Sequence, residues 1–331
     1  MMNKNKSILE VKNLRTYFAD GTDTIRAVND VSFNVRQGEI LGIVGESGSG
    51  KSVTCLSILR LVPRGGQIVG GEIIFDNEDL LKKSNREMRM YRGRRISMIL
   101  QNPMTSLNPV FKIGNQVSEP LLLHGSWNRH DVLEKAIALL QAVKIPSPSM
   151  QIAQYPHQLS GGMRQRVVTS IAIGCAPDLL IADESTTALD VTIQAQVLQL
   201  LKDIREERGL SIILVTHNLG IVAGMCDRVA VMYAGQLLEI AWTKELFSHP
   251  SHPYTKGLLR SVPRLGKGRR RLKSISGQPP DLAHVPSGCP FWPRCEETLE
   301  VCKVDCPPVT NMGSQHDVRC WLHTSGDLLK K

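Results

Sequence analysis

The residues with the clearest chemistry form a glycine-rich turn near the N-terminus. Residues 45–52 read GESGSGKS and match the phosphate-binding pattern G-x-x-x-x-G-K-[ST] at every fixed position. In such a turn, backbone N–H groups converge on phosphate oxygens, a lysine carries charge to the β- and γ-phosphates, and a serine hydroxyl ligates Mg²⁺. The sequence therefore predicts a site for a nucleoside triphosphate and Mg²⁺ in this segment, called here the phosphate turn, which consists of Gly45, Glu46, Ser47, Gly48, Ser49, Gly50, Lys51 and Ser52.

Two carboxylates end a later apolar segment, residues 179–182. Asp183 is placed there to hold Mg²⁺ through water, and Glu184 is placed to accept a proton from an attacking water. Acidic residues after a strand often do no more than cap a helix. Because this chain already carries the phosphate turn, we favour the catalytic interpretation.

A histidine and a serine–glycine segment are further candidates for phosphate contacts. His217 follows the apolar segment 211–216 and falls at the sheet edge expected to carry the phosphate turn, although a histidine at a strand end is usually structural. Ser160, Gly161 and Gly162 precede an apolar helix. They predict a helix N-terminus whose exposed N–H groups and positive dipole can hold an anion.

The elements around these residues indicate an α/β fold. Residues 39–44 predict a buried parallel strand directly before the phosphate turn, and residues 53–61 predict a helix directly after it. Further buried strands are predicted at 96–100, 179–182 and 211–216, helices within 113–143 and from 190 to 209, and a closing hairpin at 229–240.

An antiparallel β layer is predicted beside the nucleotide strand, from residues 8–18, 27–35 and 71–75. An aromatic near the end of the first of these strands could stack on adenine. Phe18 is the first choice and Tyr17 is its alternative, while packing in the core explains either residue equally well.

Composition restricts the function classes. The chain has 331 residues, 42% of them hydrophobic and 21% charged, as in ordinary globular proteins. Its net charge of +9 is not accompanied by a nucleic-acid recognition module, so we expect no nucleic-acid partner. The sequence has no signal peptide and no apolar run near the roughly 20 residues that span a bilayer, which predicts a cytosolic chain unless a partner carries it elsewhere.

Five of the eight cysteines lie between Cys289 and Cys320. In a reducing compartment they favour buried thiols or metal ligands over a disulfide framework. Four thiolates in a loop with little periodic structure suggest a metal ion or an iron–sulfur cluster. The spacings are not the C-x-x-C pairs usual for zinc, which weakens the zinc interpretation.

These motifs, in this order, resemble the ATPase subunit of an ABC transporter. The resemblance rests on GESGSGKS, Gln101, LSGGM, LLIADE, Ala188–Leu189–Asp190 and His217, and it covers about residues 8–250. MTSLNP, YPHQLSGGM, TTALDVTIQAQ and HPYT resemble the branch that serves peptide and nickel importers, and most closely dipeptide importers. The resemblance implies a P-loop NTPase cassette over residues 1–250, with a helical subdomain inserted at about 102–160, and a cysteine-containing extension over 251–331.

The resemblance also implies a role for each matching residue. Gln101 would sense the γ-phosphate and Mg²⁺, and His217 would hold the γ-phosphate and the attacking water. Asp190 would communicate across a dimer of cassettes, in which Ser160, Gly161 and Gly162 contact the ATP of the opposing cassette. The family usually has proline after the catalytic glutamate, where this chain has Ser185, which retains a backbone N–H and leaves φ less restricted. Because Asp183 and Glu184 are both present, we still expect hydrolysis.

For the cysteines, the resemblance implies a 4Fe-4S cluster held by Cys289, Cys295, Cys302 and Cys320, with Zn²⁺ as the alternative and Cys306 as a spare ligand. The implied partners are a second cassette, either identical or related, two transmembrane permease subunits and an extracytoplasmic substrate-binding protein. The implied function is ATP-driven import of dipeptides or oligopeptides at the cytoplasmic face of a bacterial membrane. A nickel importer is the alternative, and an ABC ATPase acting on nucleic acid is less favoured.

Overall fold

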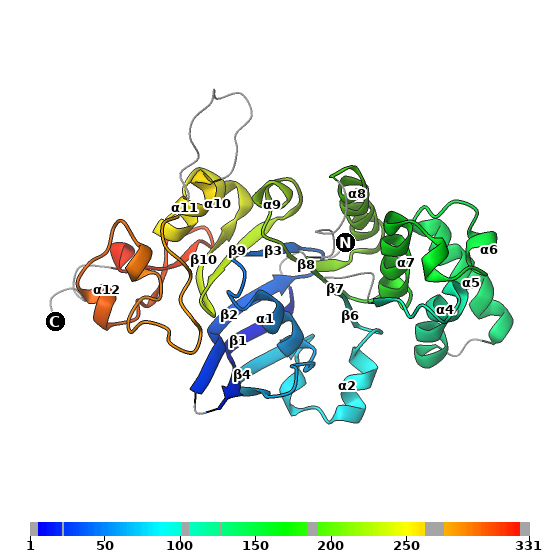
Figure 1. Cartoon of the computed structure of the whole chain (residues 1–331), viewed down its shortest axis with the longest axis horizontal. Helices are drawn as coiled ribbons and strands as arrows, with labels where there is room; N and C mark the ends of the chain where they lie inside the picture. Colours follow the sequence, from blue (N-terminus) through cyan, green and yellow to red (C-terminus); the bar gives the residue numbers. More distant parts are fainter. Residues whose placement is uncertain are drawn as a thin grey trace, which may run out of the picture. The chain divides into compact units, whose positions relative to one another are not determined.

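The computed structural model describes residues 6–21, 23–100, 106–125, 128–184, 191–261 and 275–324. It divides into two compact units, each built from several segments of the chain (Figure 1). The first unit comprises Met1–Ile8, Val35–Glu39 and Phe75–Leu214. The second comprises Leu9–Asn34, Ile40–Ile74 and Val215–Lys331.

The second unit contains the strand that leads into the phosphate turn. All five residues of β3 (Ile40–Val44) are buried, and β3 pairs in parallel with β9 (Arg228–Tyr233). The helix α1 (Lys51–Ile58) begins directly after the turn. The predicted sequence of strand, turn and helix is therefore confirmed.

Three further strands extend this sheet on the other side of β9. The strand β10 (Gln236–Trp242) pairs antiparallel with β9, as the predicted hairpin requires. Two three-residue strands, β12 (Asp317–Arg319) and β11 (Val309–Asn311), follow it to give the order β11-β12-β10-β9-β3. The sequence did not indicate β11 and β12, because three residues are too few to show an alternating pattern.

A second sheet in this unit contains β1 (Ser7–Asp20), β2 (Asp23–Arg36) and β4 (Gly66–Phe75), in the order β2-β1-β4. The predicted antiparallel layer is thus present, but β4 begins five residues before the predicted start at Gly71. Gly71 has a φ of 100°, and a Cβ there would lie 2.6 Å from Leu14 Cα. This glycine permits a close approach to β1 within the strand and does not mark its beginning.

The first unit contains three strands of a parallel sheet, in the order β8-β7-β6. They are β6 (Ile96–Ile99), β7 (Leu179–Asp183) and β8 (Ser211–Val215), and β6 pairs in parallel with β7. The unit also contains β5 (Glu78–Asp79), the turn η1 (Leu80–Lys82), α2 (Asn85–Tyr91) and α8 (Val191–Arg208). The buried strands predicted for this part of the chain are confirmed.

A group of helices lies between β6 and β7 in the sequence, and Figure 1 shows them side by side in cyan and green. They are α4 (Ile113–His124), α5 (Arg129–Ala142), α6 (Pro148–Gln151), the turn η2 (Pro156–Gln158) and α7 (Gly161–Ile173). The helices α4, α5 and α7 pack on one another. The helical pattern predicted over 113–143 thus forms two helices, and the first ends at His124, with Gly125 as its C-cap.

The C-terminal part of the second unit consists of short elements. They are α9 (Leu219–Met225), α10 (Thr243–Ser248), α11 (Pro253–Arg260), η3 (Trp292–Arg294), α12 (Val301–Val304) and η4 (Trp321–His323). Within the described ranges, every helix of the chain is too short or too polar to cross a lipid bilayer.

A buried pair of charged side chains, His316 and Glu239, connects the β11–β12 hairpin to β10. His316 Nε2 lies 2.7 Å from Glu239 Oε1, and the two side chains are 5% and 0% exposed. The hydrogen bond to Glu239 raises the pKa of His316 above 6.5, against the opposing effect of burial. Burial alone would raise the pKa of Glu239, but its hydrogen bonds, that of His316 first among them, lower it below 4.5.

This pair predicts that stability is greatest in mildly acidic solution. The contribution of His316 is complete below 6.5 and is lost as the pH rises through its raised pKa. The contribution of Glu239 is complete above 4.5 and is lost as the pH falls through its lowered pKa. The nearby Glu245 and Asp317 act on His316 in the same direction as Glu239.

We expect the melting temperature to fall by about 2–4 °C between about pH 6 and about pH 8.5, as the charge on His316 is lost. The decline should be much smaller in His316→Asn. His284→Asn is a matched control, because the side chain of His284 is 72% exposed and should leave the slope unchanged. Equal slopes in the wild type and His316→Asn would refute this assignment.

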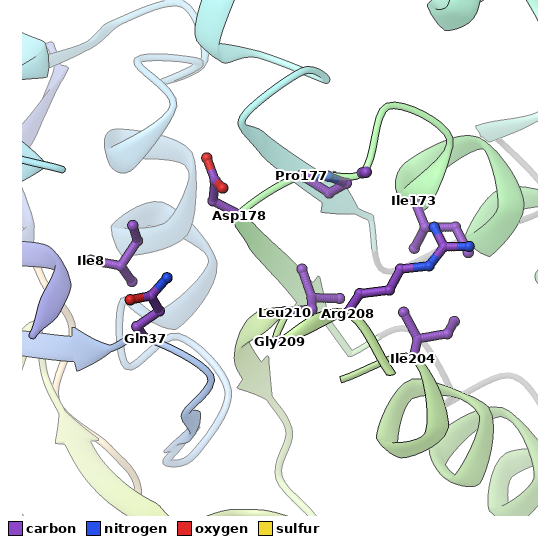
Figure 2. Close-up of a pocket in the computed structure, with 10 residues that line it drawn as sticks. Ile8, Gln37, Ile173, Pro177, Asp178, Ile204, Arg208, Gly209 and Leu210 are labelled. Atoms are coloured by element: carbon purple, nitrogen blue, oxygen red, sulfur yellow. The ribbon is translucent and has the colours of Figure 1, made fainter. Parts of the chain in front are cut away.

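The first unit contains a cavity of about 100 Å³, which we do not expect to bind the nucleotide (Figure 2). Its lining includes Ile8, Gln37, Asp178 and Arg208, and no residue predicted to bind nucleotide. Small-molecule pockets usually exceed about 300 Å³, so this cavity is too small for a nucleoside triphosphate.

Candidate functional site

Close backbone contacts explain the glycines of the phosphate turn. Gly45 has a φ of 155°, and a Cβ on it would lie 2.2 Å from the carbonyl oxygen of Met232. Gly50 has a φ of 97°, and a Cβ on it would lie 2.2 Å from the carbonyl oxygen of Ala27. Both backbone conformations favour glycine, and both contacts exclude any side chain.

Lys51 lies inside the turn and is only 5% exposed. Its ammonium donates to the carbonyl oxygens of Gly45 and Glu46, each at 2.9 Å. The lysine charge is therefore held at the centre of the loop, beside the N–H groups predicted to receive the phosphates. Ser52 follows in the first turn of α1 and is partly exposed.

A cavity of about 320 Å³ borders the turn. Glu46, Ser47, Gly48 and Ser49 form one part of its wall, and Ile25, Tyr233, Ala234 and residues 279–282 form the rest. This volume lies within the usual range of small-molecule pockets. The C-terminal extension thus contributes to a pocket at the phosphate turn, which the sequence did not indicate.

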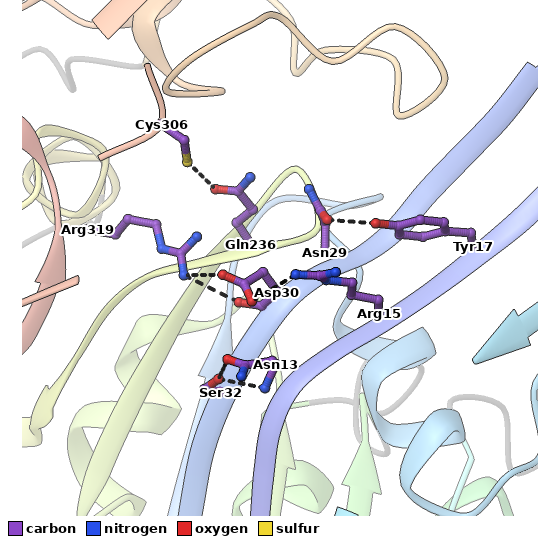
Figure 3. Close-up of polar contacts among 9 residues, drawn as sticks. All are labelled: Asn13, Arg15, Tyr17, Asn29, Asp30, Ser32, Gln236, Cys306 and Arg319. Atoms are coloured by element: carbon purple, nitrogen blue, oxygen red, sulfur yellow. Dashed lines mark hydrogen bonds and ion pairs between the residues drawn. The ribbon is translucent and has the colours of Figure 1, made fainter. Parts of the chain in front are cut away.

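The two candidate adenine-stacking residues have different surroundings. Tyr17 donates a hydrogen bond from its hydroxyl to Asn29 Oδ1 at 2.9 Å (Figure 3). The Arg26 guanidinium carbon lies 6.0 Å from the Tyr17 ring centroid. The ring of Phe18 lies against Gly66, where an added Cβ would come within 2.5 Å of Cε1. Both rings are partly exposed, so the choice between them stays a prediction.

The carboxylates lie in the first unit, at the end of β7. Asp183 is 4% exposed, and Glu184 has a φ of 43°, in the left-handed region. A residue with a side chain in this conformation costs on the order of 1 kcal/mol or more, and such strain is concentrated at functional sites. His217 lies in the second unit, is exposed and follows β8 by two residues.

The helix start predicted at Ser160 is confirmed. Ser160 is the N-cap of α7, and its hydroxyl accepts from the N–H of Met163 at 3.3 Å. Ser160 and Gly161 are exposed, whereas a Cβ on Gly162 would lie 2.9 Å from the Ile193 side chain. The tip of α7 thus presents an exposed backbone beside the start of α8. Gln101, Ser185 and Asp190 lie outside the described residues.

Four of the five C-terminal cysteines lie together. A cavity of about 10 Å³ is lined by Cys289, Cys295, Cys302 and Cys320 with His252 and neighbouring side chains, so the side chains fill most of the space that they share. Cys306 lies outside it, and its thiol donates to Gln236 Oε1 at 3.6 Å (Figure 3). Burial raises the pKa of Cys289 to about 12 and that of Cys320 to about 11. Within the described ranges, no three His, Cys, Asp or Glu residues are arranged to hold a metal ion, so this finding supports neither the predicted 4Fe-4S cluster nor the zinc alternative.

His252 adds a buried N–H group to the lining of the same cavity. Its Nδ1 accepts from the N–H of Tyr254 at 3.0 Å, which caps α11. Burial lowers the pKa of His252 to about 4, so the ring is neutral near pH 7 and its proton lies on Nε2. Nε2 is buried and has no hydrogen-bond partner in the part of the chain that the structure describes. A buried donor of this kind is costly unless an acceptor is present.

The geometry of the phosphate turn, with its strand and helix, defines a P-loop nucleotide-binding protein. Two family models match the chain: "ABC transporter" over residues 28–187 and "Oligopeptide/dipeptide transporter, C-terminal region" over residues 238–302. The chain belongs to the ABC transporter family of ATP-binding proteins, and it is an ATPase.

Individual relatives agree with this assignment. The dipeptide transport ATP-binding protein DppD of Bacillus subtilis is 50% identical over 96% of this chain and 95% of its own length. The oligopeptide transport ATP-binding protein OppD of Haemophilus influenzae is 46% identical over 95% of this chain and 97% of its own. A solved dimer of an ATP-binding cassette with ADP and Pi is 27% identical, with a TM-score of 0.64, and covers 71% of this chain and 98% of its own.

Proposed function

We propose that this chain energises the import of dipeptides or oligopeptides through a membrane ABC transporter. The observation that carries the proposal is the 50% identity to a dipeptide transport ATP-binding protein along nearly the whole of both chains. The match of residues 238–302 to the C-terminal region of oligopeptide and dipeptide transporters supports it, because this region lies outside the segment that matches the general ABC transporter model.

The proposed hydrolysis uses the predicted residues in the following roles. Lys51 and the backbone N–H groups of the phosphate turn hold the β- and γ-phosphates. Ser52, Gln101 and Asp183 would hold Mg²⁺, which would neutralise charge on the phosphate oxygens. Glu184 takes a proton from the attacking water. The water oxygen bonds to the γ-phosphorus as the bond between the γ-phosphorus and the β,γ-bridging oxygen breaks. His217 orients the γ-phosphate and the water. The products are ADP and inorganic phosphate.

A second cassette would complete each nucleotide site. The tip of α7 (Ser160, Gly161 and Gly162) is proposed to contact the ATP of the opposing cassette, with Asp190 at the interface between the two. The exposed backbone at this tip supports the proposal, because N–H groups at a helix start favour a phosphate. ATP then favours the closed pair, because only that state makes both sets of contacts.

The proposed partners are a second cassette, identical or related, two transmembrane permease subunits and an extracytoplasmic substrate-binding protein, with this chain at the cytoplasmic face of the membrane. The helical part of the first unit supports a docking role. Val110 and Phe111, before α4, are 71% and 51% exposed, and Leu122 and Leu123, at its end, are 50% and 72% exposed. Exposed apolar pairs of this kind are suited to burial against another protein.

Co-purification of the intact transporter tests the proposal. Identification of the subunits and of the solute on the binding protein distinguishes peptide import from nickel import, which is the second candidate. Phosphate release should rise when peptide-loaded binding protein is added. A complex that contains no permease, or one that carries nickel and no peptide, would contradict the proposal.

We further propose that Cys289, Cys295, Cys302 and Cys320 hold a 4Fe-4S cluster. Four thiols that line one cavity support it, with Cys289, Cys302 and Cys320 buried and Cys295 partly exposed. The unmet hydrogen-bond donor at His252 Nε2 supports it too, because thiolates and sulfides are acceptors. When bound, the cluster would supply a redox-active group and a cross-link between loop segments.

Cysteine substitutions give a direct prediction. Anaerobically purified wild type should absorb broadly in the visible range and contain equal amounts of iron and sulfide. Cys302→Ser should lose most of the colour and iron, whereas Cys306→Ser, an exposed cysteine outside the cavity, should keep both. A colourless protein loaded with zinc would contradict the cluster.

A further inference from the structure

Glu46 is the residue of the phosphate turn that the C-terminal extension holds. Its carboxylate accepts two hydrogen bonds from Arg294, Nη1 to Oε2 at 2.7 Å and Nη2 to Oε1 at 3.0 Å. Its backbone N–H donates to the Tyr254 hydroxyl at 3.0 Å. Arg294 and Tyr254 lie 248 and 208 positions away from Glu46 in the sequence, yet both contact this one residue.

Arg294 is fixed in this geometry. Its side chain is 6% exposed, and its Nε donates to the carbonyl oxygen of Ser276 at 2.9 Å. Nη1 also donates to the Tyr233 hydroxyl at 3.2 Å, and the guanidinium carbon lies 5.8 Å from the Tyr233 ring centroid. A paired contact with a carboxylate depends on the planar guanidinium, which a lysine cannot reproduce.

Tyr254 is held equally firmly at the start of α11. It is fully buried, with ring centroids 4.7 Å from Tyr233 and 5.3 Å from Phe291. Burial raises the pKa of its phenol, so the hydroxyl remains neutral and accepts the Glu46 N–H.

Glu46 in turn helps to orient the lysine, together with Gly45. Its carbonyl oxygen accepts from Lys51 Nζ at 2.9 Å and from the Ser49 N–H at 3.2 Å. A change in the position of Glu46 therefore shifts both the lysine charge and one of the turn's N–H groups. The extension thus reaches the phosphate site through Glu46: Arg294 and Tyr254 contact Glu46, and Glu46 contacts Lys51 and Ser49.

We propose that Arg294 and Tyr254 are positioning residues of the nucleotide site, which hold Glu46 so that Lys51 and the phosphate turn are arranged for the triphosphate before it binds. Neither residue touches the reacting atoms. The inference rests on ATP binding at the phosphate turn and requires no metal ion or cluster. Positioning of this kind strengthens binding by reducing the reorganisation that the ligand must otherwise induce.

The test is the affinity of the full-length chain for a fluorescent, non-hydrolysable ATP analogue with Mg²⁺. Arg294→Lys should weaken binding about tenfold, since it retains the charge but loses the paired contact. In the co-purified transporter, KM for ATP should rise by a similar factor while kcat changes by less than about twofold, because the loop acts on substrate and transition state alike.

Arg319→Lys is the matched control. Arg319 also links the C-terminal extension to a carboxylate: its Nη2 lies 3.0 Å from Asp30 Oδ2 (Figure 3). The Arg319 side chain is 12% exposed. Asp30 lies in β2 and outside the phosphate turn. We expect Arg319→Lys to lower the melting temperature about as much as Arg294→Lys does, and to leave the ATP affinity unchanged. An equal loss of affinity in both arginine variants would overturn the inference and attribute the effect to stability.

Two further variants separate the possible outcomes. Tyr254→Phe keeps the buried ring and removes only the hydroxyl, and it should weaken ATP binding severalfold. This variant tests the positioning role even if Arg294→Lys does not fold. In Glu46→Ala/Arg294→Ala the loss should be close to that of either single change, because both remove the same contact. Wild-type affinity in Arg294→Lys and Tyr254→Phe would refute the positioning role, whereas a wild type that binds no ATP would contradict the ATPase assignment itself.

Discussion

Glu184→Gln is expected to lower the rate of ATP hydrolysis at least about 100-fold, the usual contribution of a general base, while ATP affinity stays within about threefold of the wild type. The amide keeps the size of the side chain but cannot accept the proton of the attacking water. Glu184 has a φ of 43° at the end of β7, and glutamine tolerates this backbone no worse than glutamate does. Phosphate release by the assembled transporter measures the rate, and titration with a fluorescent ATP analogue measures the affinity.

Glu206→Gln is the matched control for this prediction, because Glu206 is an exposed residue of α8 in the same unit. It should hydrolyse ATP at the wild-type rate. If Glu184→Gln hydrolysed ATP as fast as Glu206→Gln, another group would have to accept the proton, and the role proposed for Glu184 would be wrong.

The second large effect is expected at Lys51. Lys51→Ala should weaken ATP binding about 100-fold or more, because a charge-assisted contact to two phosphates is lost within an almost closed loop. The ammonium also bonds the carbonyl oxygens of Gly45 and Glu46, so the empty loop should lose some order. Lys51→Met, which keeps most of the side-chain volume, tests whether the loss of affinity exceeds the loss of packing.

Lys144→Ala serves as the control for Lys51→Ala. Lys144 pairs with Asp203 at 3.1 Å on the surface of the first unit, and its side chain is 63% exposed. We expect unchanged ATP affinity, since exposed ion pairs contribute little. ATP affinity that survives in both Lys51 variants would show that the phosphate turn is not the nucleotide site.

The sequence predicted the local parts of this protein well, for identifiable reasons. GESGSGKS predicted the turn before α1 because Gly45 and Gly50 are required by contacts that no side chain permits. Ser160 predicted the start of α7 because an N-cap is a local interaction, here with Met163. The buried strands β3, β7 and β8 were predictable because apolar residues make up most of each one.

What the sequence missed depends on residues far apart along the chain. Arg294 lies in a proline-rich segment whose composition gives no indication that its partner is Glu46. His316 and Glu239 are 77 positions apart and form a buried pair that holds β12 on β10. The motif HPYT was recognisable as a family feature, but only the fold shows that Tyr254 contacts the phosphate turn and that His252 borders the cysteine cavity.

The central claim is that ATP hydrolysis by this chain drives peptide import, and uptake of labelled dipeptide into proteoliposomes that contain the co-purified transporter tests it most directly. With peptide-loaded binding protein on one side and ATP on the other, the account predicts uptake that requires ATP and is abolished when this chain carries Glu184→Gln. Uptake that continues at the wild-type rate with Glu184→Gln, or ATP hydrolysis with no movement of peptide, would contradict it.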